Sequence, residues 1–296
     1  MRSAARDAAL VRAMPLVFVL IWSTGFIVAR YGMPHAPPFK FLAMRYALSI
    51  LCFLLWVRLR RVPWPQDGRQ WVHLAVTGVL MHALYLGGVW AAVKAGMGAG
   101  LSALIVGLQP VLTAVWLASA GTRVAGRQWA GLGCGFAGLV LVVSHKLDSG
   151  GVGDQAGFNS LAMVVVALLS ITAGTLYQKR FVGPCDVRTA NVVQLGAALA
   201  VTLPLALLET ETVRWGAGFA GALAWSVLVL TLAGSSLLYL LIQRGAATSV
   251  TSLFYLVPPT TALMAWLLFS EPVTASTLVG TALTAYGVSL VLRAPR

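Results

Sequence analysis

The chain has 296 residues, of which 59% are hydrophobic and only 10% are charged, and its formal net charge is +13. A soluble domain carries about 25% charged residues, so this composition excludes an ordinary soluble enzyme and indicates an integral membrane protein. The positive charge alone would suit a nucleic-acid-binding protein. The basic residues lie in short runs between apolar segments, however, and form no basic face with aromatic residues on which bases could stack, so we expect no nucleic-acid partner.

Ten segments are predicted as transmembrane helices, because a helix needs about 20 mostly apolar residues to cross a bilayer. They are residues 14–29, 39–57, 71–92, 98–119, 126–144, 159–177, 189–208, 219–242, 247–269 and 274–292. The three arginines before the first segment resemble the start of a signal peptide, but nine further spans favour a first helix that is retained.

The distribution of lysine and arginine predicts the orientation of these helices. Most of the 21 basic residues fall in loops on the side of the N terminus. Those predicted on the other side are Arg30, Lys40, Lys94, Lys146 and Arg214. Basic residues are enriched in cytoplasmic loops, so both termini are predicted in the cytoplasm.

One long polar interruption, residues 145–158 with SGGVGDQAG in its middle, divides the chain into halves of five helices each. Its glycine and small polar residues are typical of a flexible linker. We therefore predict a first five-helix repeat at 1–144, a linker at 145–158 and a second five-helix repeat at 159–296.

The two halves share an apolar segment with a proline in its middle. LSALIVGLQPVLTAVW at 101–116 aligns with SVTSLFYLVPPTTALM at 249–264, so that Pro110 matches Pro258. A proline inside an apolar helix frees a backbone carbonyl, which only protein or a wet cavity can satisfy within lipid. Two such segments at corresponding positions point to a binding site between repeats, with Pro110 and Pro258 as hinge residues.

Elsewhere an offset of 149 residues aligns the halves. The matched pairs are Gly25 with Gly174, Arg30 with Lys179, Trp90 with Tyr239, Gly131 with Gly280 and Gly138 with Gly287. Because five is an odd number, the second half must enter the membrane from the opposite side. The predicted fold is an all-α integral membrane protein of ten transmembrane helices, arranged as two inverted five-helix repeats.

A family resemblance adds to this interpretation. The segment LVPPTTALMAWLLFSEPVTASTLVGTALTAYGVSLVL resembles the EamA-like, ten-helix branch of the drug/metabolite transporter superfamily through Pro258, Glu271, Gly280 and Gly287. The first half has the proline and both glycines but GTR at 121–123 in place of the glutamate, and IWSTGFIVARY resembles the first helix of the family. The resemblance covers nearly the whole chain. It implies a transporter, whose family members export amino acids and diverse metabolites, without specifying the cargo.

The candidate substrate-binding residues are polar or aromatic side chains within the predicted helices, where such groups usually face protein or water. They are Trp22, Arg45, His82, Tyr85, Trp90, Gln109, Tyr239, Gln243 and Tyr255. Gln109 and Tyr255 each share a helical face with hydroxyl side chains. These faces either line a cargo path or supply hydrogen bonds between helices. Gly131 and Gly280 are assigned a structural role in close helix contact.

Three further residues have two interpretations each. Arg45, about 9 Å from the outer end of its helix at 1.5 Å per residue, either holds a carboxylate of the cargo or extends to the outer interface. His82 is either a proton-coupling site or, as we favour, a neutral histidine hydrogen-bonded between helices. Glu271 precedes the tenth helix and is expected mainly to stabilise the positive end of that helix, rather than to contact cargo.

Missing residue patterns exclude other chemistries. All eight acidic residues lie in the termini or loops, which argues against a proton relay built on Asp or Glu and against a permanently cationic cargo. The three cysteines and four histidines show no metal-binding spacing, and no Walker motif is present, so we expect no metal, no cofactor and no ATP hydrolysis.

The sequence therefore predicts a multi-pass inner (plasma) membrane secondary transporter. It would export a small organic metabolite, either amino-acid-like or another zwitterionic or neutral solute, by alternating access around helices 1, 3, 4, 6, 8 and 9. Its partners are this small-molecule cargo and the lipid bilayer. The alternatives are an importer or exchanger of the same superfamily and a membrane-embedded lipid-modifying enzyme, which would need clustered Asp, His or Cys.

Overall fold

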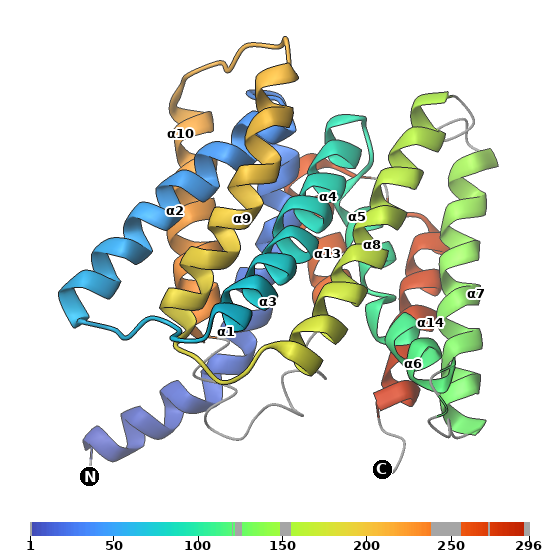
Figure 1. Ribbon diagram of the computed structural model, residues 1–296. Helices are drawn as coiled ribbons and strands as arrows, with labels where there is room; N and C mark the ends of the chain where they lie inside the picture. The colour runs from blue at the N-terminus through green and yellow to red at the C-terminus, as the bar shows by residue number, and fades with distance from the viewer. Residues whose placement is uncertain are drawn as a thin grey trace.

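The structure, a computed structural model, describes residues 2–119, 121, 126–148, 155–237, 256–271 and 273–292. These residues form an all-helical bundle (Figure 1). Its first-half elements are α1 (Arg2–Gly32), α2 (Pro38–Arg60), α3 (Gly68–Gly78), η1 (Val79–Leu84), α4 (Tyr85–Lys94), α5 (Ala99–Val106), α6 (Gln109–Ser119) and α7 (Gly126–Asp148). Its second-half elements are α8 (Gln155–Phe181), α9 (Val187–Leu208), α10 (Ala217–Ala224), η2 (Trp225–Ala233), α13 (Val257–Phe269) and α14 (Ala275–Leu292).

Each of the ten predicted segments contains a helix within the described residues. Six helical stretches there are long and apolar enough to cross a membrane, and α13 is among the shorter apolar helices. Large apolar side chains such as Leu51, Val166 and Leu267 are exposed on the outside of the bundle, as expected where lipid rather than water is the solvent. Helices α7 and α8 reach into the predicted linker from both sides, because α7 continues to Asp148 and α8 begins at Gln155.

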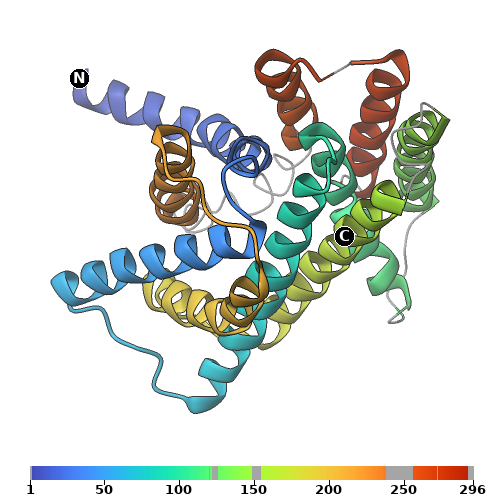
Figure 2. The same cartoon turned by 90° about the horizontal axis from the view of Figure 1, so that it is seen from above.

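The start of α1 and the end of α14 lie at the same end of the bundle (Figure 1), as an even number of crossings requires. Helices α2 and α9, the second helix of each half, pack along one another, and so do α7 and α14, the fifth helix of each half (Figures 1 and 2). Equivalent helices of the two halves therefore meet each other.

The fourth helix of the first half is interrupted immediately before its proline. Helix α5 ends at Val106, a turn follows at residues 107–108, and α6 begins at Gln109 with Pro110 next. Helix α13 begins at the equivalent position, Val257, with Pro258 next. Proline is favoured in the first turn of a helix, because the N–H that it lacks has no partner there in any case.

Both third helices contain a π-helical segment, which the sequence analysis did not predict. Segment η1 covers Val79–Leu84, and η2 covers Trp225–Ala233, which includes the residues 149 positions after η1. π-Helical turns are rare and are often found at functional sites. Because they recur at the same position in both repeats, the residues on these two segments are candidates for a functional site.

Glycines permit the close contact between α7 and α14. A Cβ atom on Gly138 would lie 2.5 Å from the carbonyl oxygen of Gly280, and one on Gly287 would meet the backbone of Gly131. The hydroxyl of Thr284 donates to the carbonyl of Gly135 at 3.5 Å, at the centre of the crossing. Gly131 pairs with Gly287 and Gly138 with Gly280, so the helices run antiparallel and their backbones touch, as small residues allow within membranes.

Candidate functional site

The candidate site begins with a buried arginine where α2 meets η2. Arg45 is 8% exposed, and its Nε and Nη2 atoms both donate to the hydroxyl oxygen of Thr231, each at 3.2 Å. That hydroxyl in turn donates to the carbonyl of Ser226 at 2.9 Å, five residues earlier, which is the spacing of a π-helical turn. The π segment thus holds Thr231 in front of the guanidinium group.

The equivalent position in the other half makes the equivalent contact. Gln194 of α9 lies 149 residues after Arg45, and Thr231 lies 149 residues after His82 of η1. The side chains of Gln194 and His82 also interact with each other. A Cβ atom on Gly78 would meet the backbone of Gln194, so α9 and the start of η1 are in direct contact. The same polar contact is therefore made twice, with the halves exchanged.

Three of the predicted substrate-binding residues gather at this crossing. The guanidinium of Arg45 lies close enough to His82 and Tyr85 to interact with both electrostatically. Tyr46 donates its hydroxyl hydrogen to the carbonyl oxygen of His82 at 2.8 Å. We name Arg45, His82, Tyr85, Gln194 and Thr231 the central polar cluster.

Gln109 lies at a second crossing and makes a hydrogen bond between helices. Its amide nitrogen donates to the hydroxyl of Thr175 in α8 at 2.8 Å. The equivalent start of α13 contacts α1, where the hydroxyl of Ser23 donates to the carbonyl of Val257 at 3.5 Å and that of Thr261 donates to the carbonyl of Ser23 at 3.4 Å. The fourth helix of each half thus contacts the first helix of the other.

Other predicted residues lie elsewhere. Trp90 is 1% exposed and packs with its ring centroid 4.5 Å from that of Phe41, which also contacts Phe219 of α10. Trp22 is half-buried on α1, 5.3 Å from the ring of Phe18. The structure therefore places Trp90 in the apolar core. Tyr239, Gln243 and Tyr255 lie outside the described residues.

Glu271 binds a different helix from the one expected. Its carboxylate accepts the backbone N–H groups of Ala99 at 2.9 Å and Gly100 at 3.4 Å, at the start of α5. The start of α14 is capped instead by the hydroxyl of Thr274, which accepts the N–H of Thr277 at 3.2 Å. The expectation that Glu271 serves the tenth helix was therefore wrong, since the loop carries the carboxylate to another positive helix end.

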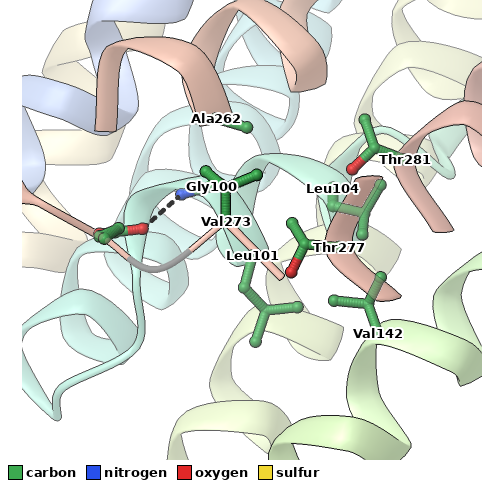
Figure 3. A pocket seen from close by; sticks show the side chains of 9 residues that line it. Gly100, Leu101, Leu104, Val142, Ala262, Val273, Thr277 and Thr281 are labelled. Atoms are coloured by element: carbon green, nitrogen blue, oxygen red, sulfur yellow. Dashed lines mark hydrogen bonds between the residues drawn. The ribbon is translucent and has the colours of Figure 1, made fainter. Parts of the chain in front are cut away.

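A shallow pocket lies beside this contact (Figure 3). Figure 3 shows Thr277 and Thr281 of α14 gathered with Leu104 of α5 and Val142 of α7, next to the hydrogen bond of Gly100. The lining is mostly apolar and includes no predicted substrate-binding residue, so the pocket is not part of the candidate site.

Acidic residues after α9 also connect the two halves, at the same end of the bundle as Glu271. The carboxylate of Glu209 accepts the N–H groups of Phe39 and Lys40 at the start of α2, at 3.0 and 2.8 Å. The carboxylate of Glu211 forms an ion pair with Lys94 at 2.7 Å. Together with Glu271, these residues tie the second half to the first on this side. The sequence placed all three in loops, but it gave no partner for Glu209 or Glu211 and the wrong helix for Glu271.

Among the described residues, no group of three or more His, Cys, Asp or Glu side chains is arranged to hold a metal ion. The polar groups that converge are a guanidinium, amides, hydroxyls and an imidazole. Such groups can donate hydrogen bonds to a polar solute and accept hydrogen bonds from it.

Comparisons with known proteins agree with this architecture. The model of the EamA-like transporter family matches residues 12–144 and 159–293. An uncharacterized transporter of Archaeoglobus fulgidus is 26% identical over 274 residues, which cover 92% of this chain and 93% of that protein. An uncharacterized inner membrane transporter of Escherichia coli K12 is 24% identical over 242 residues, covering 81% of this chain and 76% of that protein.

A probable amino-acid metabolite efflux pump of Escherichia coli K12 is 22% identical over 294 residues, covering 93% of this chain and 92% of that protein. A crystal structure with 17% sequence identity superposes with a TM-score of 0.66 and covers 94% of this chain and 95% of that one, which shows a shared fold. With the family match extending over both halves, the chain belongs to the EamA-like transporter family and is a multi-pass membrane transporter rather than an enzyme.

Proposed function

We propose that this protein exports a small organic solute, amino-acid-like or otherwise zwitterionic or neutral, across the inner (plasma) membrane. The observation that carries the proposal is a polar contact between a second helix of one half and a third helix of the other, which occurs twice with the halves interchanged. Arg45 with Thr231 and Gln194 with His82 occupy equivalent positions, and they surround the crossing of second and third helices. A site at the interface of two inverted repeats is typical of transporters that work by alternating access.

The motion is a rocking of one half against the other about the central polar cluster. The ties made by Glu209, Glu211 and Glu271 close one end of the bundle, which is the outer end in the orientation given by the positive charges. Release of a solute to the outside then requires these ties to open. The interrupted fourth helix and the start of α13 provide the points where the backbone can bend.

Export is favoured over import by the relatives. Two of them are named as probable amino-acid metabolite efflux pumps, and both align with more than 90% of the chain. Both termini lie in the cytoplasm in this proposal, since the basic loops alternate with the predicted helices.

The experiment compares cells that have or lack the protein for growth and for solute accumulation, against a panel of amino acids and their analogues. Lower accumulation of at least one compound in cells with the protein is expected. Gln109→Leu and Tyr255→Ala are expected to abolish this difference while the protein still inserts in the membrane. If no compound distinguishes the cells, amino-acid export is excluded for the panel. Flux in vesicles of known orientation separates an exporter from an importer or exchanger.

A further inference from the structure

The guanidinium group of Arg45 is buried without a matching negative charge among the described residues. Its hydrogen-bonding partner there is the neutral hydroxyl of Thr231, which receives two of its five N–H groups. A buried charge within a membrane is costly and is usually paired with an opposite charge. The remaining N–H groups are suited to an oxygen acceptor that carries the missing charge.

The chain itself cannot supply that charge. All its acidic residues, including those beyond the described ranges, lie outside the ten apolar segments. The carboxylates of Glu209, Glu211 and Glu271 bind helix N-termini and Lys94 instead. A bound anionic solute can supply the counter-charge that the apolar segments of the chain lack.

Two orphaned hydroxyl groups on the same two helices strengthen the argument. Ser49 and Ser226 are fully buried, and neither hydroxyl has a hydrogen-bond partner among the described residues. Ser49 follows Arg45 by one turn of α2, and Ser226 precedes Thr231 by one turn of η2, so each lies on the same face as a member of the contact. Buried hydroxyls are rarely left without a partner, and these two are available to donate to a ligand oxygen.

The charge at this position suits a single carboxylate. One arginine binds a carboxylate with two parallel N–H donors. A phosphate carries close to two negative charges at neutral pH and would need a second cation. The equivalent position, Gln194, is neutral, and with His82 it offers acceptor atoms for an ammonium or amide group of the same solute.

We infer that Arg45, with Thr231 and the Ser49 and Ser226 hydroxyls, forms the subsite for the carboxylate group of the transported solute. This inference rests on the proposed transport function and narrows its substrate class to monocarboxylates, amino acids among them. The solute is oriented with its carboxylate toward α2 and η2 and its neutral or cationic part toward Gln194 and His82.

The test measures ligand-induced thermal stabilisation of the purified full-length protein in a neutral detergent. The probes are sodium acetate, sodium propionate and L-alanine, each against its amide, with sodium chloride as a control for anions in general. The wild-type protein is expected to prefer each acid over its amide by about ten-fold or more, as for a hydrogen bond between charged groups. Chloride at the same concentration should not reproduce the shift.

The decisive variant is Arg45→Gln, because glutamine is the residue at the equivalent position of the other half. Its preference for acid over amide should fall to about one-fold, since glutamine lacks the positive charge that attracts a carboxylate. Arg58→Gln is the matched control, as it removes an exposed arginine from the same helix and should leave the preference unchanged. Ser49→Ala combined with Ser226→Ala removes two hydroxyls that have no hydrogen-bond partner among the described residues. This variant should fold even if Arg45→Gln folds poorly, and its preference for acid over amide should fall several-fold.

The inference is overturned if the wild-type protein does not distinguish acids from amides, if chloride stabilises it equally, or if Arg45→Gln retains the preference. An unchanged preference in the variant that combines Ser49→Ala with Ser226→Ala would also contradict it. Efflux by cells is a separate measurement. Carboxylate binding that depends on Arg45, in a protein that moves no solute, would leave the subsite in place and refute the proposed export.

Discussion

The glycine crossing of α7 and α14 supports a sharp prediction, because the same helix provides its own control. In Gly138→Ala the new methyl carbon would lie 2.5 Å from the carbonyl oxygen of Gly280, and 2.6 and 2.9 Å from Oγ1 and the backbone nitrogen of Thr284. Carbon atoms make favourable contacts at about 3.5–4.0 Å, so the two helices must separate by about 1 Å. Overpacking of this kind costs about 1–3 kcal/mol.

Gly133 lies on the same helix, and a Cβ atom there would meet nothing within 4 Å. Both substitutions to alanine gain the same helix propensity, about 1 kcal/mol in water, so this term cancels when the variants are compared. The free energy of unfolding of Gly138→Ala should therefore fall below that of Gly133→Ala by about 1–3 kcal/mol. Titration of the purified proteins with a denaturing detergent, followed by circular dichroism, measures the difference.

Equal stability of the two variants would refute the reasoning, since it would mean that the helix backbones do not touch in the protein. A large loss in both would also refute it, because the exposed position would then be as constrained as the buried one. Only a loss confined to Gly138→Ala agrees with the packing.

Three further predictions follow from the contacts. Gly78→Ala would press a methyl group against the backbone of Gln194 and should abolish transport, whereas Gly196→Ala, with open space at its Cβ, should transport normally; equal transport by both would contradict the close contact. Glu271→Gln should lower the free energy of unfolding by about 0.5–2 kcal/mol through a weaker cap on α5, and thermal unfolding no different from wild type would exclude that role. Hydrogen bonds from Arg188 lower the pKa of the Asp186 carboxyl below its ordinary value of 3.8. The ionised carboxylate therefore stabilises the folded protein above pH 3.8, and this contribution is lost as the pH falls through the lowered pKa. Asp186→Asn should therefore lose less thermal stability than wild type between pH 6 and about 3, and parallel losses would contradict the assignment.

The sequence was sufficient for those features that depend on local composition. The ten helical segments follow from apolar length. The repeat marked Gly131 and Gly280, and Gly138 and Gly287, as equivalent positions, but the contacts join Gly131 to Gly287 and Gly138 to Gly280, which the repeat alone did not predict. Arg45, His82 and Tyr85 were recognisable because charged and amphipathic side chains are rare inside apolar segments. Their convergence was not predictable in the same way, since it depends on how four helices cross.

Small hydroxyl residues gave no comparable signal. Threonine and serine are common within membrane helices, so nothing local marked Thr231 as the partner of Arg45. The repeat could have identified Thr231. It stands 149 residues after His82, just as Gln194 stands 149 residues after Arg45, so the offset relates the two pairs. The π-helical segments and the partner of Glu271 could not be found this way, as both depend on contacts between distant parts of the chain.

The paired contacts also bear on why the two halves share one chain. Contacts that recur with the halves exchanged have the self-complementary form of an isologous interface, such as two identical five-helix subunits would make in antiparallel association. In such a dimer, an arginine at the position of Arg45 would appear twice and place two like charges close together in a low-dielectric interior. Joining the halves removes that constraint. One position can then remain Arg45 while its equivalent is Gln194, so the site acquires a positive end and a neutral end that a symmetric pair of subunits cannot have.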